Sequence, residues 1–217
     1  MKDFFIKRKI EKYEQHLDEH LDDPLYFKKL GDLCLQLSRT EPAIEYYQDA
    51  IDAYYQDNSR VGEGNDFIFE ICWKLLEIDP LNTLACGTLG QEYCGLGEFD
   101  EAITLYKTFA SKLIEAAQYD DAIVYFRNAL VLQPDDIEVR QNCFSLLWHL
   151  RRKEEAVQEL RKIAELAEKT ENITKALECY NKAVNIMPSD SELQTELKRL
   201  KQLAGNVEKP LRLVVNK

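Results

Sequence analysis

Two histidines near the N-terminus have a spacing that could bind a metal ion. His16 and His20 lie four residues apart in His16-Leu17-Asp18-Glu19-His20, which fits the His-x-x-Glu-His order of some zinc peptidases. On one helix this spacing would place both rings on the same face, where zinc binds when further ligands converge. Three fixed positions in five residues are weak evidence in so acidic a segment. We therefore expect two exposed histidines and no metal site.

Two glycine-rich stretches, Gly87-Thr88-Leu89-Gly90 and Gly95-Leu96-Gly97, have the composition of a phosphate-binding loop. Such a loop follows a strand and continues into Gly-Lys-Ser/Thr, and neither stretch does so. A close crossing of two helices explains Gly90, and a turn explains Gly97. We therefore expect no nucleotide and no other cofactor.

The six cysteines favour packing over chemistry. No two of them form a Cys-x-x-Cys pair, and a free cysteine behaves as a small apolar residue in a protein core. Paired carboxylates are unavoidable among 39 acidic residues, so their pairing carries no information. No catalytic constellation is convincing, and we expect a protein that is not an enzyme. The cysteines are Cys34, Cys72, Cys86, Cys94, Cys143 and Cys179.

Composition favours a folded cytoplasmic protein. The chain has 217 residues, of which 45% are hydrophobic and 31% charged, enough to fold without disulfides or metal. No window approaches 18 uncharged apolar residues, so we expect no membrane span. Residues 1–9 contain only a short apolar run before a series of charges, unlike a secretory signal.

Charge is distributed unevenly along the chain. Residues 150–217 contain 14 Lys/Arg and 11 Asp/Glu, and the totals of 28 and 39 leave 14 and 28 for residues 1–149. The net charge is therefore +3 for residues 150–217 and −14 for residues 1–149. An acidic surface repels nucleic acid and anionic lipid and favours a basic partner segment. Basic runs at 151–153, 161–162 and 198–201 could form a second face that accepts acidic groups, or the surface could simply be uneven in charge.

The strongest feature of the sequence is an internal repeat. Pro80, Pro134 and Pro188 follow one another at equal intervals, and each ends a similar apolar phrase. Glu101-Ala102-Ile103 returns at the same interval as Glu155-Ala156-Val157. A fixed period of this size indicates supersecondary units that stack and bury a continuous core, and such proteins present a surface for binding.

These positions resemble the tetratricopeptide repeat (TPR) family, whose unit of about 34 residues is two antiparallel helices with small residues at their crossing and a closing proline. The wider spacing here suggests a variant whose repeat has three helices and about 54 residues. Phe144 replaces the crossing glycine in the third repeat, so we expect a different surface there. The matching residues are Leu30-Gly31, Ala43, Tyr47 and Ala50; Leu89-Gly90, Tyr93, Ala102, Tyr106 and Phe109; Ala122, Phe126, Ala129 and Pro134; and Ala176, Tyr180, Ala183 and Pro188.

The resemblance implies an all-α fold, a right-handed helical-repeat solenoid of antiparallel helices that forms a TPR-like superhelix. We expect three repeats at 23–80, 81–134 and 135–188. Apolar periodicity and capping signals predict first helices at 25–38, 83–96 and 137–150, second helices at 41–57, 99–117 and 154–168, and third helices at 66–78, 120–132 and 173–186. The first repeat is longer because of a polar loop at 57–64.

Both ends of the solenoid need caps, because a terminal repeat otherwise exposes its core. An apolar stripe from Phe4 to Leu21 predicts an N-terminal capping helix over 1–22. Ser189-x-x-Glu192 has the pattern of a capping box and predicts a C-terminal capping helix over 189–204. Residues 205–217 form an extended apolar tail that belongs to neither.

We expect a cytoplasmic, non-enzymatic adaptor or scaffold that binds a peptide or helix of a partner protein on its concave face. The acidic N-terminal region favours a basic segment, with no nucleic acid and no membrane as partner. One alternative is a structural or assembly protein that forms homo-oligomers through the 206–217 tail, and a third is a regulatory subunit of an enzyme. The predicted partner-binding residues lie on the first helices: Lys28, Lys29, Gln91, Glu92, Gln141 and Asn142.

Overall fold

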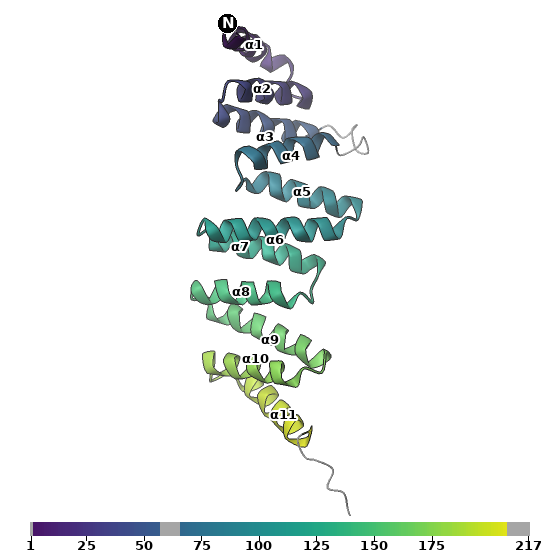
Figure 1. The fold of residues 1–217 in the computed structure, drawn as a ribbon, viewed down its shortest axis with the longest axis vertical. Coiled ribbons are helices and arrows are strands. Elements are labelled where there is room, and N and C mark those ends of the chain that lie inside the picture. The colour runs from purple at the N-terminus through teal and green to yellow at the C-terminus, as the bar shows by residue number, and fades with distance from the viewer. Residues whose placement is uncertain (1, 57–65, 208–217) are drawn as a thin grey trace, which may run out of the picture. The chain divides into compact units, whose positions relative to one another are not determined.

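A computed structural model describes residues 2–56 and 66–207, and every regular element within them is a helix (Figure 1). The chain forms two compact units, residues 1–105 and 106–217. The N-terminal unit contains α1 (Lys2–Gln15), the short 3-10 helix η1 (Leu17–Glu19), α2 (Pro24–Gln36), α3 (Thr40–Gln56), α4 (Asp66–Ile78), α5 (Thr83–Leu96) and the start of α6 (Phe99–Glu115). The C-terminal unit contains the rest of α6, α7 (Tyr119–Leu132), α8 (Ile137–His149), α9 (Lys153–Lys169), α10 (Ile173–Ile186) and α11 (Ser191–Val207).

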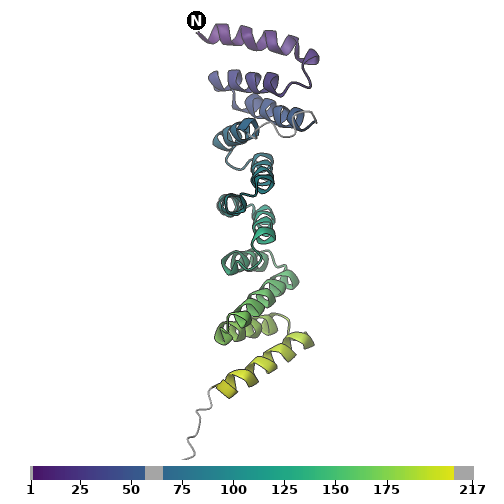
Figure 2. The same ribbon diagram turned by 90° about the vertical axis from the view of Figure 1, so that its right-hand side faces the viewer.

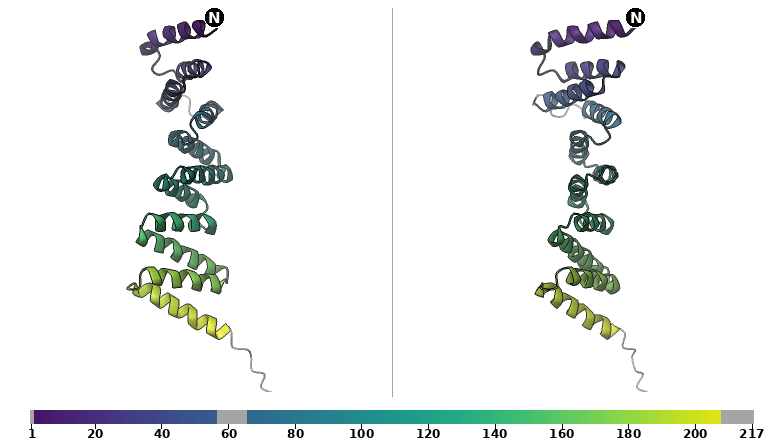
Figure 3. Two further views of the ribbon diagram at one scale, coloured as in Figure 1. Left: turned by 60° about the vertical axis from the view of Figure 1, so that its left-hand side comes forward. Right: turned by 90° about the vertical axis from the view of Figure 1, so that its left-hand side faces the viewer.

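Alternate helices of the N-terminal unit share a layer. α2 packs on α3, α3 on α4 and α4 on α5. Lys28 of α2 forms an ion pair of 2.7 Å with Glu70 of α4, so these two helices lie side by side. On the other side, the Tyr55 hydroxyl of α3 donates a hydrogen bond to Glu92 of α5. Consecutive helices therefore alternate between two layers, as the side views in Figure 3 show for α2 to α5.

The C-terminal unit follows the same rule. From α7 to α11 each helix packs on its successor, and Figure 2 shows α7 and α8 on alternate sides. Lys107 of α6 pairs with Asp136 at the start of α8 at 3.0 Å, which places α6 and α8 in one layer. Arg161 of α9 pairs with Asp190 at the start of α11 at 3.4 Å, which places α9 and α11 in the other. Lys107 and Arg161 are separated by the same interval as the periodic prolines, and so are Asp136 and Asp190.

Helices α2 and α3 cross closely at Gly31. Tyr47 of α3 is fully buried, and a Cβ atom added at Gly31 would lie 2.7 Å from its ring. The Tyr47 hydroxyl donates to Asp32 at 2.6 Å, and the same carboxylate oxygen accepts from Lys74 of α4 at 2.6 Å. Burial, together with the bond to Asp32, raises the pKa of Tyr47. One tyrosine thus connects three helices of the N-terminal unit.

Small residues fill the remaining crossings, as their spacing predicts. Alanine brings two helix backbones close without a large side chain between them, and the hydrophobic surface removed from water stabilises the contact. The alanines that match the repeat pattern are all buried: Ala43, Ala50, Ala102, Ala122, Ala129, Ala176 and Ala183.

Five helices end in the same way. At the end of α2, Ser38 adopts a φ of 56°, and the Arg39 N–H donates to the Cys34 carbonyl at 3.0 Å. This Schellman arrangement provides donors for carbonyl groups of the last turn. A left-handed φ favours glycine, and four of the five residues carry a side chain. The other positions are Gly97 after α5, Ala117 after α6, Arg151 after α8 and Glu171 after α9.

The three periodic prolines lie in a second type of turn, after α4, α7 and α10. Two residues beyond each proline, a side-chain oxygen accepts a backbone N–H of the next helix and caps its N-terminus. The capping residues are Asn82, Asp136 and Asp190, with bonds of 2.9, 3.0 and 3.1 Å. Asp190 therefore has the capping role that the sequence suggested for Ser189.

The first helix is shorter than predicted. α1 ends at Gln15, and the Tyr26 hydroxyl of α2 donates at 2.8 Å to the carbonyl of Tyr13 in its last turn. The chain then reverses so that Asp23 can cap α2. His16 and His20 consequently flank η1 and do not share a helix face.

The other predicted helices agree closely with the observed bounds. α5, α6 and α7 begin at Thr83, Phe99 and Tyr119, and α8, α9 and α10 begin one period later. The division of the chain into repeats at 23–80, 81–134 and 135–188 stays a prediction. The 57–64 loop and the tail beyond residue 207 lie outside the described residues.

Replacing Gly31 with alanine should destabilise the protein. The new Cβ would collide with the Tyr47 ring, which is enclosed and must shift. Overpacking of this kind costs about 1–3 kcal/mol. Gly87 of α5 is the matched control, because nothing lies within 4 Å of an added Cβ there and alanine favours a helix. In urea unfolding, the free energy of unfolding should fall for Gly31→Ala and rise slightly for Gly87→Ala. Equal changes in the two variants would contradict a close crossing at Gly31.

Ala117→Gly should stabilise the protein. Ala117 has a φ of 59°, a conformation that glycine adopts at lower energy, so a gain of about 0.5–1 kcal/mol is expected. The neighbouring Ala116→Gly provides the control, since Ala116 has no left-handed φ and glycine there only adds unfolded-state freedom. In thermal unfolding, the melting temperature should rise for Ala117→Gly and fall for Ala116→Gly. A lower melting temperature for both variants would exclude the left-handed turn at Ala117.

Candidate functional site

The predicted partner-binding residues of the N-terminal unit lie in two layers. Lys28 and Lys29 belong to α2, and Lys28 is engaged with Glu70 while Lys29 is exposed. Gln91 and Glu92 belong to α5, where Gln91 is exposed and Glu92 accepts the Tyr55 hydroxyl. Because α2 shares its layer with α4, and α5 with α3, no single face of this unit presents both pairs.

The other two predicted residues lie on α8 in the C-terminal unit. Gln141 is exposed and lines a hollow, whereas its neighbour Asn142 is half-buried. The hollow has a volume of about 330 Å³ and lies between the alternate helices α8 and α10, with α9 beneath. We call it the α8–α10 hollow. Its lining consists of Gln141, Phe144 and Ser145 from α8, Leu160 and Ile163 from α9, and Lys175, Glu178, Cys179 and Lys182 from α10.

The base of the hollow is apolar. Phe144, Leu160, Ile163 and Cys179 are buried and provide its inner surface. Phe144 occupies the position at which the earlier repeats have glycine. The Lys182 ammonium lies 4.2 Å from the centroid of the Phe144 ring, a cation–π contact that attaches α10 to α8. The irregular residue of the repeat thus forms one wall of the hollow.

The rim of the hollow is polar and carries an excess of positive charge. Lys175, Glu178 and Lys182 lie along α10, at intervals that place them on one helix face. Lys175 approaches Glu178 only to 3.9 Å, and Lys182 has no carboxylate within 4 Å among the residues that the structure describes. Gln141 and exposed Ser145 provide the polar edge on α8. An apolar side chain with an acidic neighbour would fit this distribution.

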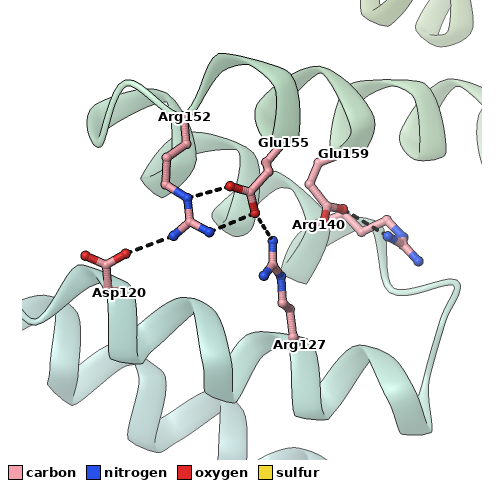
Figure 4. Close-up of polar contacts among 6 residues, drawn as sticks. All are labelled: Asp120, Arg127, Arg140, Arg152, Glu155 and Glu159. Atoms are coloured by element: carbon pink, nitrogen blue, oxygen red, sulfur yellow. Dashed lines mark hydrogen bonds and ion pairs between the residues drawn. The ribbon is translucent and has the colours of Figure 1, made fainter.

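An ion-pair cluster fixes α9 against α7 on the opposite layer (Figure 4). Glu155 of α9 accepts from Arg127 of α7 at 2.7 Å and from Arg152 at 2.6 Å. Arg152 also reaches Asp120 of α7 at 2.8 Å. The hydrogen bonds from Arg152 and Arg127 lower the pKa of Glu155 to about 2. Because α9 forms the base of the hollow, this cluster helps to hold the hollow in shape.

A less exposed pair joins α8 to α9. Arg140 donates to Glu159 at 2.9 Å and to the Pro134 carbonyl at 3.0 Å, and both charged side chains are largely buried (Figure 4). Part of the basic character predicted for a second face is used in the same way. Arg152, Arg161 and Arg199 each pair with an acidic residue of another helix, and Arg199 also pairs with Glu196 of its own helix. These ion pairs join helices of the C-terminal unit.

Family models match three segments of the chain. Models described as tetratricopeptide repeat match residues 113–173 with one model and residues 29–57 and 162–190 with another. The overlapping segments 113–173 and 162–190 include the helices that form the α8–α10 hollow. The chain is a tetratricopeptide-repeat protein.

Solved structures give matches of low similarity to this TPR protein. YrrB, a TPR protein with an unusual peptide-binding site, is 19% identical over 88% of this chain and 99% of its own, with a TM-score of 0.26. BtubC (BKLC) from P. vanneervenii is 14% identical over 93% of this chain and 85% of its own, with a TM-score of 0.41. MamA is 16% identical over 77% of this chain and 91% of its own, with a TM-score of 0.32. A comparison with curated protein sequences found no match.

The histidines near the N-terminus of the TPR protein make local hydrogen-bond and stacking contacts, and most of its cysteines are buried. A ring nitrogen of His16 donates to the Lys12 carbonyl at 2.8 Å, and His20 stacks on Tyr26 with centroids 4.2 Å apart. Within residues 2–56 and 66–207, no group of His, Cys, Asp and Glu is arranged to hold a metal ion. Five of the six cysteines are buried, and Cys94 is half-buried. Burial raises the pKa of the Cys72 and Cys143 thiols to about 12.

Sequence reasoning missed the α10 wall of the site. Lys175, Glu178 and Lys182 lie on α10, whereas the predicted partner-binding residues lie only on the helices expected to be first in each repeat. The substitution of glycine by Phe144 was the signal that this region differs.

Among the described residues, no helix is long and apolar enough to cross a membrane.

The ion-pair cluster predicts a specific response to acid. Glu155 has a pKa of about 2 in the folded state against an ordinary value of 4.5, so its contribution is complete above pH 4.5 and is lost as the pH falls towards 2. Its side chain is 40% exposed, which limits the effect to under about 1 kcal/mol. Glu155→Gln should lower the melting temperature at pH 7, and its difference from wild type should shrink below pH 4.

Glu154→Gln is the control for this prediction, because Glu154 lies in the same helical turn and is exposed. It should change the melting temperature less than Glu155→Gln at pH 7. If the two variants give the same pH profile, the arginine contacts contribute nothing beyond the favourable position of a carboxylate at a helix N-terminus.

Proposed function

We propose that this TPR protein is an adaptor that binds a peptide or helical segment of a partner protein in the α8–α10 hollow. The observation that supports the proposal is an apolar base under a polar, net cationic rim, set between alternate helices. Peptide sites commonly combine apolar pockets that provide affinity with a few polar groups that fix orientation. The segment that fits best carries an apolar anchor beside an acidic side chain.

Preorganisation is the proposed mechanism. The base residues Phe144, Leu160 and Ile163 are buried in the free protein, and ion pairs join α9 to both α7 and α8. A partner segment would therefore meet a hollow that already has its bound shape. The entropy lost on ordering falls mainly on the flexible segment, so a rigid hollow favours affinity.

The residues predicted from sequence enter this proposal unequally. Gln141 lines the hollow, and we propose a contact there, with Asn142 in a supporting place beside it. Lys28 and Lys29 on one layer of the N-terminal unit, and Gln91 and Glu92 on the other, remain proposals for two separate faces. Self-association through residues 206–217 rests on a tail of which only residues 206 and 207 are described, as the end of α11, and it is not proposed as the function.

We also propose that the protein works in the cytoplasm. All six cysteines are unpaired, and five of them are buried where a disulfide partner is absent. Unpaired buried thiols suit a reducing compartment, in which disulfides rarely persist.

The test is a selection of binding peptides followed by a matched pair of variants. A displayed random-peptide library is selected on wild-type protein, and the enriched peptides are measured against Ser145→Phe and Ser111→Phe. Both serines are exposed on helices and donate to the carbonyl four residues earlier, at 2.9 and 3.0 Å. Only Ser145 lines the hollow.

Filling the hollow with phenylalanine at position 145 should weaken peptide binding at least about tenfold, which corresponds to about 1.4 kcal/mol. Ser111→Phe should bind like wild type, and both variants should melt alike. If the enriched peptides bind Ser145→Phe with unchanged affinity, the hollow is not the site. Enrichment of peptides that share an apolar residue next to Asp or Glu would support the proposed chemistry.

A further inference from the structure

An exposed aromatic group lies on the N-terminal unit, in a region that the hollow does not include. Trp73 of α4 is 48% exposed. Phe69, one turn before Trp73 on the same face of α4, meets the Tyr93 ring of α5 edge to face with centroids 4.9 Å apart. Trp73 thus lies one turn beyond an aromatic contact between the two helices, and a large part of it remains open to solvent.

Exposed carboxylates lie on α4 and after α5, beside this aromatic group. Burial raises the pKa of the Tyr93 hydroxyl, and the charges of Glu98 and Glu101 raise it further. Glu77 is exposed one turn beyond Trp73 on the same face of α4. We call this set, Phe69, Trp73, Glu77, Tyr93, Glu98 and Glu101, the acidic aromatic patch.

No basic side chain of the region neutralises the patch. From residue 66 to residue 105 the sequence has eight Asp/Glu and a single basic residue, Lys74. Lys74 is engaged with Asp32 of α2 at 2.6 Å and with Glu70 of α4 at 2.9 Å. Among the residues that the structure describes, no Lys or Arg lies over the Trp73 ring.

We propose that the acidic aromatic patch is a second docking surface, which binds an arginine or lysine side chain from a basic segment of a partner protein. The cation would lie over the open face of Trp73, the aromatic ring that attracts cations most strongly. The carboxylates around it would accept hydrogen bonds from the same side chain and its neighbours. Tryptophan and tyrosine are also among the residues that dominate binding energy in protein interfaces.

Charge complementarity decides between occupants of this surface. An apolar segment alone would leave the carboxylates unpaired, and an acidic segment would be repelled by them. Nucleic acid and anionic lipid are excluded by the same negative charge. A basic protein segment satisfies the aromatic ring and the carboxylates together.

The protein itself offers a reporter for the test. It has two tryptophans, so in a Trp148→Phe background the emission comes from Trp73 alone. The probe is a fluorescein-labelled synthetic peptide of alternating arginine and glycine, with a citrulline-for-arginine peptide of the same length as the uncharged control. Emission of Trp73 follows occupation of the patch, and anisotropy of the label follows binding to any part of the protein.

The arginine peptide should change Trp73 emission in a saturable way, and the citrulline peptide should not. Trp73→Leu should weaken binding of the arginine peptide about fivefold or more, since a cation–π contact is worth about 1 kcal/mol or more once desolvated. Glu98→Gln with Glu101→Gln should weaken it at least as much. Glu41→Gln with Glu45→Gln removes two exposed carboxylates of α3 and is the control for general charge attraction.

Equal weakening by the two double variants would show attraction by net charge alone and would overturn the proposal. Unchanged Trp73 emission at saturating peptide would overturn it as well, because the cation would then be bound elsewhere. Each variant is first checked by thermal unfolding, and Trp73→Phe replaces Trp73→Leu if the latter melts early. The Ser145→Phe variant should bind the arginine peptide like wild type, which separates this surface from the hollow.

Discussion

Packing of successive helices, from α2 to α5 in one unit and from α7 to α11 in the other, is the constraint on which the rest of the described structure depends. In each unit it places alternate helices in one layer, where their side chains can reach one another. The ion pair of Lys28 with Glu70, that of Arg161 with Asp190, and the cation–π contact of Lys182 with Phe144 all join helices two apart in the chain. These contacts provide little energy singly at an exposed surface, so they follow from the packing order and do not determine it. The surfaces available to a partner follow from that order.

Sequence periodicity predicted the helices well because their ends depend on local chemistry. Proline stops a helix, and a side chain two residues later caps the next one, so Asn82 and Asp136 could be located from spacing. Gly31 was predictable for a similar reason, since a close crossing admits no Cβ. The end of α1 was not, because it depends on Tyr26 reaching back from the next helix. Contacts between elements are invisible to a local pattern.

The predicted partner-binding residues lie in different layers, and the reason is geometric. In a unit whose helices alternate between two layers, helices an odd number of positions apart lie in opposite layers. The predicted repeat of three helices would therefore place equivalent residues in alternate layers, as Lys28 on α2 and Glu92 on α5 are placed. The sequence also does not show which basic residues are paired. In the basic runs of the C-terminal third, Arg152 and Arg199 form ion pairs with acidic residues of other helices.

Hydrogen exchange on the full-length protein, with and without a peptide selected for binding, tests the account most directly. The peptide should slow exchange in α8 and α10, the two alternate helices that form the walls of the hollow, and leave α7 unchanged. Protection confined to α7 and α9 would place the site on the opposite layer. Protection of α2 or α5 alone would move it to the N-terminal unit, and either result would contradict binding in the α8–α10 hollow.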